Sequence, residues 1–281
     1  MGLKIKELIS DGEKTLIEAG LENCRHDAEA LLGFETCMDK KDLFMNRDSE
    51  IDDAHCKSYF NYIRRRAKRE PLQYITGEQY FMGRRFSVDP SVLIPRPETE
   101  ILAVKAIEYL SERECAKTVL DLCTGSGALA VSIAIACPDL NVTASDVSAE
   151  ALAVAKQNAA DLEVSGRVSF VESDLFAAFA EKFDLIVTNP PYIKTGDLAG
   201  LAPEIYGHEP LSSLDGGADG LEFYRRIAED ARAHMREGAC LMAEIGADQA
   251  ESAVAVFSEA GFTAIEIIQD LSNRDRVLKA F

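Results

Sequence analysis

The chain has 281 residues, of which 47% are hydrophobic, so it can form one large domain and a smaller one, each with its own core. Its formal net charge of -18 argues against broad electrostatic binding of a nucleic-acid backbone. No apolar run approaches the roughly 18 residues that cross a bilayer, and charges interrupt the apolar N-terminus, so we expect a cytoplasmic protein without membrane contact.

The cysteines are odd in number and never spaced as C-x-x-C. We therefore expect reduced thiols, with neither a disulfide framework nor a metal site. The seven are Cys24, Cys37, Cys56, Cys115, Cys123, Cys137 and Cys240.

Acidic residues are concentrated after residue 100. Residues 1–100 carry 16 Lys and Arg against 19 Asp and Glu, whereas residues 101–281 carry 14 against 29. The first part is therefore the better place for an anionic partner, with RRRAKRE at residues 64–70 as its basic cluster. A solvated helix face is the favoured interpretation of this cluster, because runs of charge are usually solvated.

Helical periodicity extends through the first 69 residues, and Gly20 offers a stop for the first helix. Further helices are predicted over residues 26–34, 40–45 and 52–69, the last capped by Asp52 or Asp53 and ended by Pro71. Residues 1–70 are therefore predicted to form a small all-helical domain. The apolar stripe of its first helix comprises Leu3, Ile5, Leu8, Ile9, Leu16 and Ile17.

The pattern becomes strand-like over residues 71–96, where QYITGEQYFMGRRFSV holds β-branched and aromatic residues around Gly77 and Gly83. A β-hairpin linker is predicted there. A helix should begin at IPRPETE, with Pro97 in its first turn and Glu98 and Glu100 favourable at its positive end.

Strands and helices alternate in the rest of the chain, residues 97–281, which predicts an α/β, Rossmann-like domain with a mostly parallel sheet. The expected helices cover residues 128–136, 149–160, 221–236 and 249–260. The seven expected strands cover residues 118–122, 141–146, 168–174, 183–189, 239–246, 263–270 and 276–281.

The stretch DLCTGSGALA, residues 121–130, takes a strand directly into a glycine turn that opens a helix. Gly125 and Gly127 would let the backbone approach a ligand, although both can also be simple turn residues. Cys123 and Ala130 replace the outer glycines of the G-x-G-x-x-G fingerprint, and no Walker lysine follows. A nicotinamide dinucleotide and a P-loop phosphate are therefore disfavoured.

Asp146 ends the next strand, where such folds place a carboxylate for ribose hydroxyls. A nucleoside cofactor without pyrophosphate fits, and S-adenosylmethionine is the candidate; an N-cap or turn role for Asp146 is the alternative. In SDLF, residues 173–176, an acidic and an apolar side chain could bracket an adenine. Equally, Asp174 could cap the following helix.

The stretch DLIVTNPPYI, residues 184–193, places Asn189 at the carboxyl end of the fourth strand, beside the edge where open α/β sheets bind ligands. A planar NH2 group could donate one hydrogen to the Asn189 side chain and the other to the Pro190 carbonyl, and Tyr192 could pack on it. Pro190 and Pro191 bring no competing N–H groups. The alternative is a proline turn with Tyr192 as a surface aromatic.

NPPY after DLCTGSGALA resembles the amino methyltransferases that use S-adenosylmethionine. The stretches REPLQYITGEQYF, VLIPRPETE, NPPYI, HEPLSSLDGG, AEIGADQ and SNRDRV together resemble the release-factor glutamine methyltransferases, the PrmC or HemK family, over nearly the whole chain. The resemblance implies methylation of the glutamine amide in the GGQ motif of class I peptide chain release factors. A ribosomal-protein glutamine, adenine in nucleic acid, or a binding module without catalysis are the alternatives.

The resemblance also implies roles for single residues, with the N-terminal domain recognising the substrate protein. Catalysis falls to Asn189, Pro190 and Tyr192, and substrate binding to these with Pro191. The cofactor site comprises Thr124, Gly125, Ser126, Gly127, Asp146, Leu175 and Asn189. Cys123 stands in place of the usual leading glycine, which is tolerable if its φ is negative. Leu175 occupies a place where some relatives carry an aromatic residue, so weaker packing on adenine is expected there.

Two further segments are expected at the same pocket. IPRPETE would form a wall, with Arg96 near acidic groups, although a cap and proline turn explain it equally well. HEPLSSLDGGADG, residues 208–220, is typical of a mobile loop beside a site. His208 and Glu209 could order the pocket, and a purely structural histidine is the alternative.

Overall fold

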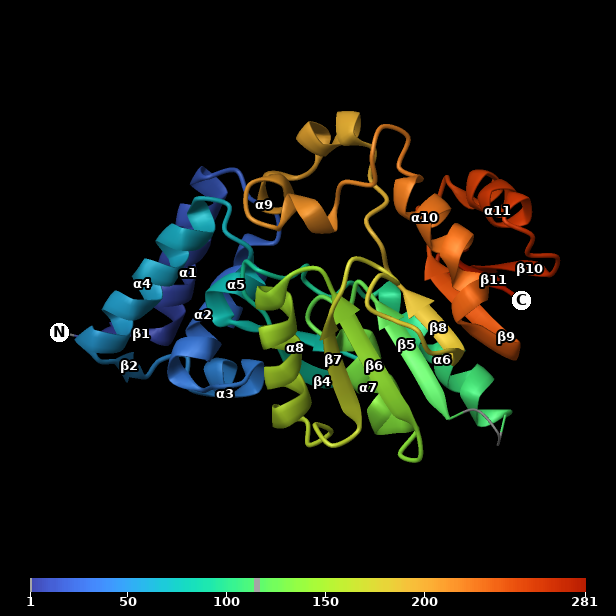
Figure 1. Ribbon diagram of the computed structural model, residues 1–281. Coiled ribbons are helices and arrows are strands. Elements are labelled where there is room, and N and C mark those ends of the chain that lie inside the picture. Colours follow the sequence, from blue (N-terminus) through green and yellow to red (C-terminus); the bar gives the residue numbers. More distant parts are fainter. Residues whose placement is uncertain (1, 114–116) are drawn as a thin grey trace. The chain divides into compact units, whose positions relative to one another are not determined.

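Two separately packed units make up the described residues, 2–113 and 117–281, of the computed structural model (Figure 1). One unit contains the described residues up to Gly77 together with Ala202–His208, and the other contains Glu78–Leu201 and Glu209–Phe281. No helix in the described part of the chain has the length and apolarity needed to span a membrane. Six of the cysteines are free thiols, and Cys115 lies outside the described residues.

Helices dominate the first unit. Its core joins the apolar faces of the first, second and fourth helices, with Tyr59 fully buried and its hydroxyl donating to the Leu8 carbonyl. Its elements are β1 (Leu3–Lys4), α1 (Ile5–Glu18), α2 (Cys24–Thr36), α3 (Lys40–Met45), β2 (Glu50–Ile51), α4 (Asp53–Ala67), α5 (Leu72–Thr76) and α9 (Pro203–Tyr206).

Local details of this unit correct the expectations. Leu3 pairs with Ile51 in a short antiparallel ladder instead of starting the helix. Ile17 is 59% exposed, because each helical residue turns about 100° and Ile17 therefore leaves the stripe that contains Leu16. Asp52 is the cap of α4 and accepts from the backbone N–H groups of Ala54 and His55.

The basic cluster at residues 64–70 is more than a solvated face. The Arg66 side chain is only 12% exposed and pairs with Asp27 and with Glu204. Arg69 also contacts Glu204, and Arg65 pairs with Glu70. Three of the five cations in this cluster, Arg65, Arg66 and Arg69, are therefore paired with carboxylates within the unit.

The predicted hairpin is shorter than residues 71–96. Leu72–Thr76 forms α5, which Gly77 ends in the left-handed conformation, so a glycine expected in the hairpin closes a helix instead. The hairpin itself pairs β3 (Glu78–Phe81) with β4 (Arg84–Ser87). Met82 and Gly83 both have positive φ in its two-residue turn, as tight hairpins require.

The second unit is built around a seven-stranded sheet, as predicted. Its strand order is β10-β11-β9-β8-β5-β6-β7. The five strands from β9 to β7 are parallel, and β11 runs antiparallel to both of its neighbours. The strands are β5 (Thr118–Leu122), β6 (Asn141–Asp146), β7 (Val168–Glu172), β8 (Phe183–Thr188), β9 (Met235–Glu244), β10 (Ile265–Gln269) and β11 (Asp275–Ala280).

Alternating side chains of the central strands enter two cores, one on each face of the sheet. Leu185 and Val187 of β8 pack with α6, α7 and α8, whereas Ile186 packs with α10 and α11. The covering helices are α6 (Thr99–Ser111), α7 (Ala128–Ala136), α8 (Ala149–Asp161), α10 (Glu222–Ala231) and α11 (Ala250–Glu259).

Two predicted boundaries are wrong. The helix expected to end at residue 236 ends at Ala231 and a short 3-10 turn (Arg232–His234) follows, because Met235 pairs with Phe183 and begins β9. Pro97 lies before α6 instead of in its first turn. Two more 3-10 helices, Thr195–Gly200 and Leu211–Ser213, lie between β8 and α10.

Candidate active site

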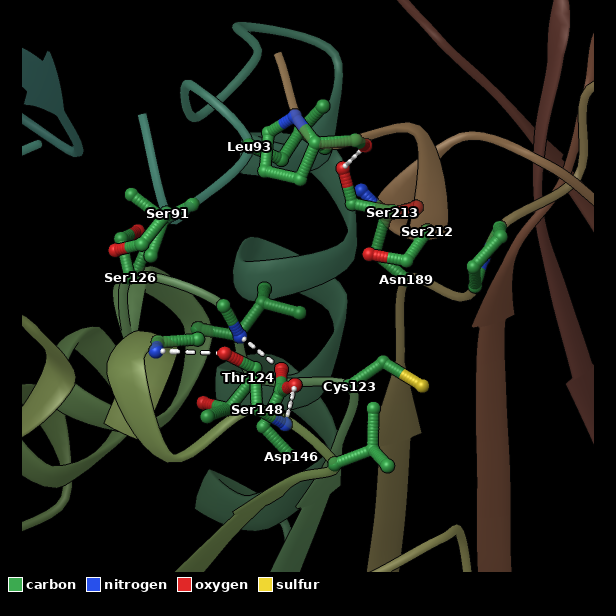
Figure 2. A pocket seen from close by; sticks show the side chains of 18 of the residues that line it. Ser91, Leu93, Cys123, Thr124, Ser126, Asp146, Ser148, Asn189, Ser212 and Ser213 are labelled. Carbon is green, nitrogen blue, oxygen red and sulfur yellow. Dashed lines mark hydrogen bonds between the residues drawn. The ribbon is translucent and has the colours of Figure 1, made fainter. Parts of the chain in front are cut away.

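A cavity of about 340 Å³ lies where the parallel strands β5, β6, β7 and β8 end (Figure 2). This volume is within the roughly 300–1,000 Å³ of small-molecule sites. Its place at the carboxyl ends of the strands is the one that open α/β sheets use for ligands. The candidate residues that line it are Thr124, Gly125, Ser126, Asp146, Leu175, Asn189 and Pro191.

Cys123, the first residue after β5, contradicts the expectation of a negative φ. Its φ is 59°, a conformation that costs most residues about 1 kcal/mol. Contacts on both sides hold it there, because the Thr124 N–H donates to the Ser145 carbonyl at 2.9 Å and the Thr124 hydroxyl donates to Asp121 at 2.6 Å. The thiol is not activated, since burial raises its pKa far above the usual value.

The two glycines of the loop have different roles. A Cβ atom at Gly125 would meet nothing within 4 Å, so its backbone borders the open cavity. A Cβ atom at Gly127 would lie 3.0 Å from the Cβ of Ala155. Gly127 lies outside the cavity wall built by the described residues, and its small size lets α7 and α8 approach closely.

A buried carboxyl group supports the loop from beneath. Oδ2 of Asp121 accepts from the Thr124 hydroxyl and from the Ala130 N–H at 3.0 Å. Oδ1 has no hydrogen-bond partner among the described residues. Burial raises the pKa of Asp121 to about 7. Asp121 therefore holds the loop without itself reaching the ligand space.

Asp146 has the structural role of a turn residue and is also placed at the cavity. Its oxygens accept from the N–H groups of Gly125 at 2.9 Å and Ser148 at 3.0 Å, which makes it a turn residue. It also lines the cavity, while the cap of α8 is Ser148 (Figure 2). Burial raises the pKa of Asp146. The carboxylate keeps further lone pairs for hydroxyl groups of a ligand.

The loop after β7 presents Leu175 to the cavity. Leu175 has a φ of 50°, and the Ser173 hydroxyl donates to its carbonyl at 2.7 Å. Asp174 does not cap a helix, because only turns lie between β7 and β8, and its side chain pairs with Arg226 at 2.7 Å. The apolar contact offered at this point is therefore Leu175.

The four residues of NPPY, which follow β8, do not all line the cavity. Asn189 donates from Nδ2 to the Thr99 hydroxyl at 3.2 Å, so its Oδ1 remains the acceptor. Pro191 lines the cavity, whereas Pro190 is buried and, like Tyr192, lies outside the wall that the described residues build. Tyr192 is not a surface aromatic, because its hydroxyl donates to Glu244 at 3.2 Å and its ring packs on the core beneath.

An ion pair connects two further segments that line the cavity, IPRPETE and the loop at residues 209–213. Arg96 lines the cavity and contacts Oε1 of Glu209 at 2.5 Å, which confirms the acidic neighbour expected for it. Oε2 of Glu209 accepts from the Ile94 N–H, and the Glu209 side chain is 1% exposed. Glu209 thereby ties the loop at residues 209–213 to IPRPETE. His208 belongs to the other unit.

Three residues that support NPPY were not singled out from the sequence. They are Thr99, Glu244 and Gln249, whose Nε2 donates to the Tyr192 carbonyl at 2.9 Å. For Glu244 and Gln249, the sequence signal that could have indicated this role was the polar residues of AEIGADQ at the end of an apolar strand. Among the described residues, no group of three His, Cys, Asp or Glu side chains could hold a metal ion.

The sheet and its cavity define a methyltransferase fold. Residues 101–203 match the family described as Methyltransferase small domain. A solved methyltransferase from Pyrococcus furiosus superposes with a TM-score of 0.51 at 18% identity, over 72% of this chain and 90% of that one.

The chain belongs to the release factor glutamine methyltransferase family. It is 39% identical to the release factor glutamine methyltransferase of Clostridium acetobutylicum over 99% of this chain and 98% of the relative. The enzyme of that name from Geobacter sulfurreducens is 42% identical over 94% and 91% of the two chains. Residues 7–77 match the PrmC N-terminal domain.

Proposed function

We propose that this protein transfers a methyl group from S-adenosylmethionine to the side-chain amide of the glutamine in the GGQ motif of class I peptide chain release factors. The observation that carries the proposal is the shared cavity. Asp146, at the end of β6, and Asn189, directly after β8, lie on either side of β5 and line the cavity together. An acceptor for a sugar hydroxyl and an acceptor for an amide nitrogen thus border the same space.

The residues present fit the cofactor. Asp146 would accept from the ribose hydroxyls, the open backbone at Gly125 would border the amino-acid part, and Leu175 would contact the adenine. When bound, S-adenosylmethionine supplies an activated methyl carbon. The apolar wall and the buried Asp121 beneath the loop would keep these groups in place.

Asn189 and the Pro190 carbonyl would hold the glutamine amide. An amide nitrogen is a weak nucleophile because its lone pair is delocalised, and two acceptors aligned with its hydrogens favour the pyramidal form that develops during transfer. Tyr192 is less available for stacking than the sequence suggested, since its hydroxyl is committed to Glu244. Its proposed contribution is therefore to fix the backbone carrying the acceptors.

The N-terminal helical domain, residues 1–70, is proposed to bind the release factor. Its support is a separate core of its own, centred on Tyr59 and Leu8, which the cavity does not require. A chain without residues 1–70 should keep cofactor affinity and lose release-factor binding. Equal loss of both would contradict this assignment, as would unchanged release-factor binding.

The function is tested by offering release factor, ribosomes and DNA side by side with radiolabelled cofactor. Mass spectrometry of the release factor should then locate one added methyl group on the GGQ glutamine. Label found only in ribosomal protein or only in DNA would replace the proposed substrate with one of these. The net charge of -18 makes DNA the least favourable of the three.

A further inference from the structure

Asn158 is a buried polar residue of α8 that lies outside the cavity wall built by the described residues. It is 1% exposed and stands among the buried residues of the helix, which include Ala155 and Ala159. Burying an amide is costly unless hydrogen bonds satisfy it, whereas an apolar residue would pack there without that requirement. The partners of this amide therefore indicate why a polar residue occupies the position.

Three hydrogen bonds use the whole amide group of Asn158. Its Oδ1 accepts from the Ser87 N–H at 2.7 Å, and its Nδ2 donates to the Ser87 carbonyl at 3.0 Å and to the Ser126 carbonyl at 2.8 Å. A backbone N–H can only donate and a backbone carbonyl can only accept, so these partners fix which end of the amide is oxygen and which is nitrogen. Among side chains of this size, only an amide supplies one acceptor and two donors in this arrangement.

The first partner, Ser87, connects the β-hairpin to a wall of the cavity. It is the last residue of β4, and Ser91 and Arg96, further along the same segment, line the cavity (Figure 2). The hairpin is also fixed to this segment, because the Gln79 side chain donates to the Pro95 carbonyl at 3.1 Å. A hydrogen bond to Ser87 therefore acts on the start of the segment that carries this wall.

The second partner, Ser126, belongs to the glycine loop. It lines the cavity and directly precedes Gly127, the cap of α7. Its carbonyl takes no part in the helix, since the Ala130 N–H, four residues on, donates to Asp121 at 3.0 Å. The Gly127 N–H is bonded within the loop at 2.8 Å. The peptide group that joins Ser126 to Gly127 is thus held at its N–H by the loop and at its carbonyl by Asn158.

We propose that Asn158 is a positioning residue for cofactor binding, which ties the glycine loop to the end of the β-hairpin so that two segments of the cavity wall keep a fixed arrangement. The inference rests on the proposed function, in which the open backbone at Gly125 borders the amino-acid part of S-adenosylmethionine. Ser126 follows Gly125 directly, so a rotation of the Ser126 peptide group would move the backbone that borders the ligand. Asn158 acts through Ser126 and takes no part in the transfer itself.

The test measures cofactor affinity by calorimetry in two variants. Asn158→Leu keeps the approximate size of the side chain and removes all three hydrogen bonds. Asn158→Asp keeps the shape and the acceptor for the Ser87 N–H, but its carboxylate cannot donate to the two carbonyls. Both variants should weaken S-adenosylmethionine binding about 5-fold to 10-fold, the size expected when one backbone hydrogen bond no longer holds the loop. The KM for release factor at saturating cofactor should stay near wild type.

Two control variants separate positioning from a general loss of stability. Phe257→Leu removes buried area from the core on the other face of the sheet, so it should lower the Tm without changing cofactor affinity. Gln157→Leu makes the same change of amide to leucine at an exposed neighbour on α8 and should change neither. Wild-type affinity in both Asn158 variants, or an equal loss of affinity in Phe257→Leu, would overturn the inference.

Hydrogen exchange in the ligand-free protein separates this inference from the proposed function. In Asn158→Leu, residues 84–88 and 123–127 should exchange faster than in wild type, while β9 should be unchanged. Unchanged exchange in both segments would refute the positioning role even in a protein that methylates release factor. Faster exchange in a protein that binds no S-adenosylmethionine would support the hold of Asn158 on the loop and refute the proposed cofactor.

Discussion

Gly216, in the loop between β8 and α10, is placed where a single methyl group would disturb NPPY. A Cβ atom there would lie 2.7 Å from the Cα of Tyr192 and 2.9 Å from the Pro191 carbonyl oxygen. Its N–H also donates to the Ile193 carbonyl at 2.7 Å, which holds the two segments together. Both neighbours are backbone atoms, so Gly216→Ala cannot be accommodated by rotating a side chain.

The size of the effect follows from that geometry. Atoms closer than 3.0 Å must separate by several tenths of an ångström, and overpacking of this kind typically costs about 1–3 kcal/mol. A loss of that size corresponds to a fall in Tm of roughly 2–12 °C in a chain of this length. Since the displaced atoms of Pro191 and Tyr192 directly follow the proposed substrate acceptors at Asn189 and Pro190, we also expect kcat to fall by about 10-fold or more.

The assay pairs initial rates of release-factor methylation with thermal unfolding. Gly166→Ala is the matched control, because Gly166 is exposed, has no positive φ, and a Cβ atom there meets nothing within 4 Å. The control should leave both Tm and kcat near wild type. If Gly216→Ala also matched wild type in both measurements, the close packing of the loop against NPPY would be refuted.

Three other substitutions test separate parts of the site. Asn189→Ala should lower kcat roughly 30-fold to 1000-fold, the 2–4 kcal/mol typical of one aligned transition-state contact, with a smaller change in cofactor affinity; wild-type turnover would refute its role. Arg96→Met leaves the buried Glu209 carboxylate without its partner and should cost about 1–3 kcal/mol in urea unfolding, so unchanged stability would contradict the importance of this pair. Asp121 has a pKa of about 7 in the folded protein against 3.8 as its ordinary value, so between these pH values the folded state holds a proton that the unfolded state has lost. The free energy of unfolding should therefore decrease as pH rises through that window, by up to about 4 kcal/mol from this group, and Asp121→Asn should remove that contribution. Identical pH dependence of urea unfolding in wild type and variant would show that Asp121 does not titrate there.

Much of the second unit follows from patterns that act locally along the chain. The buried runs at β5 and β8 have the length and composition of central strands, and each ends just before residues that line the cavity. Parallel strands bring their carboxyl ends to one edge, so the sequence alone predicts that Asp146 and Asn189 lie at the same cavity. Helix α5 could not be predicted from the sequence, because residues 72–76 are too few to show a helical period.

Sequence by itself determined which residues end strands, where glycines and prolines interrupt the backbone, and hence where a ligand site forms. Only the tertiary structure decided that Gly127 packs against Ala155, that Cys123 adopts a positive φ, and that Tyr192 faces Glu244. It also brought Thr99 to Asn189 across 90 positions of the chain. Such contacts depend on how finished elements pack, and no local periodicity encodes the distance between two side chains on different strands and helices.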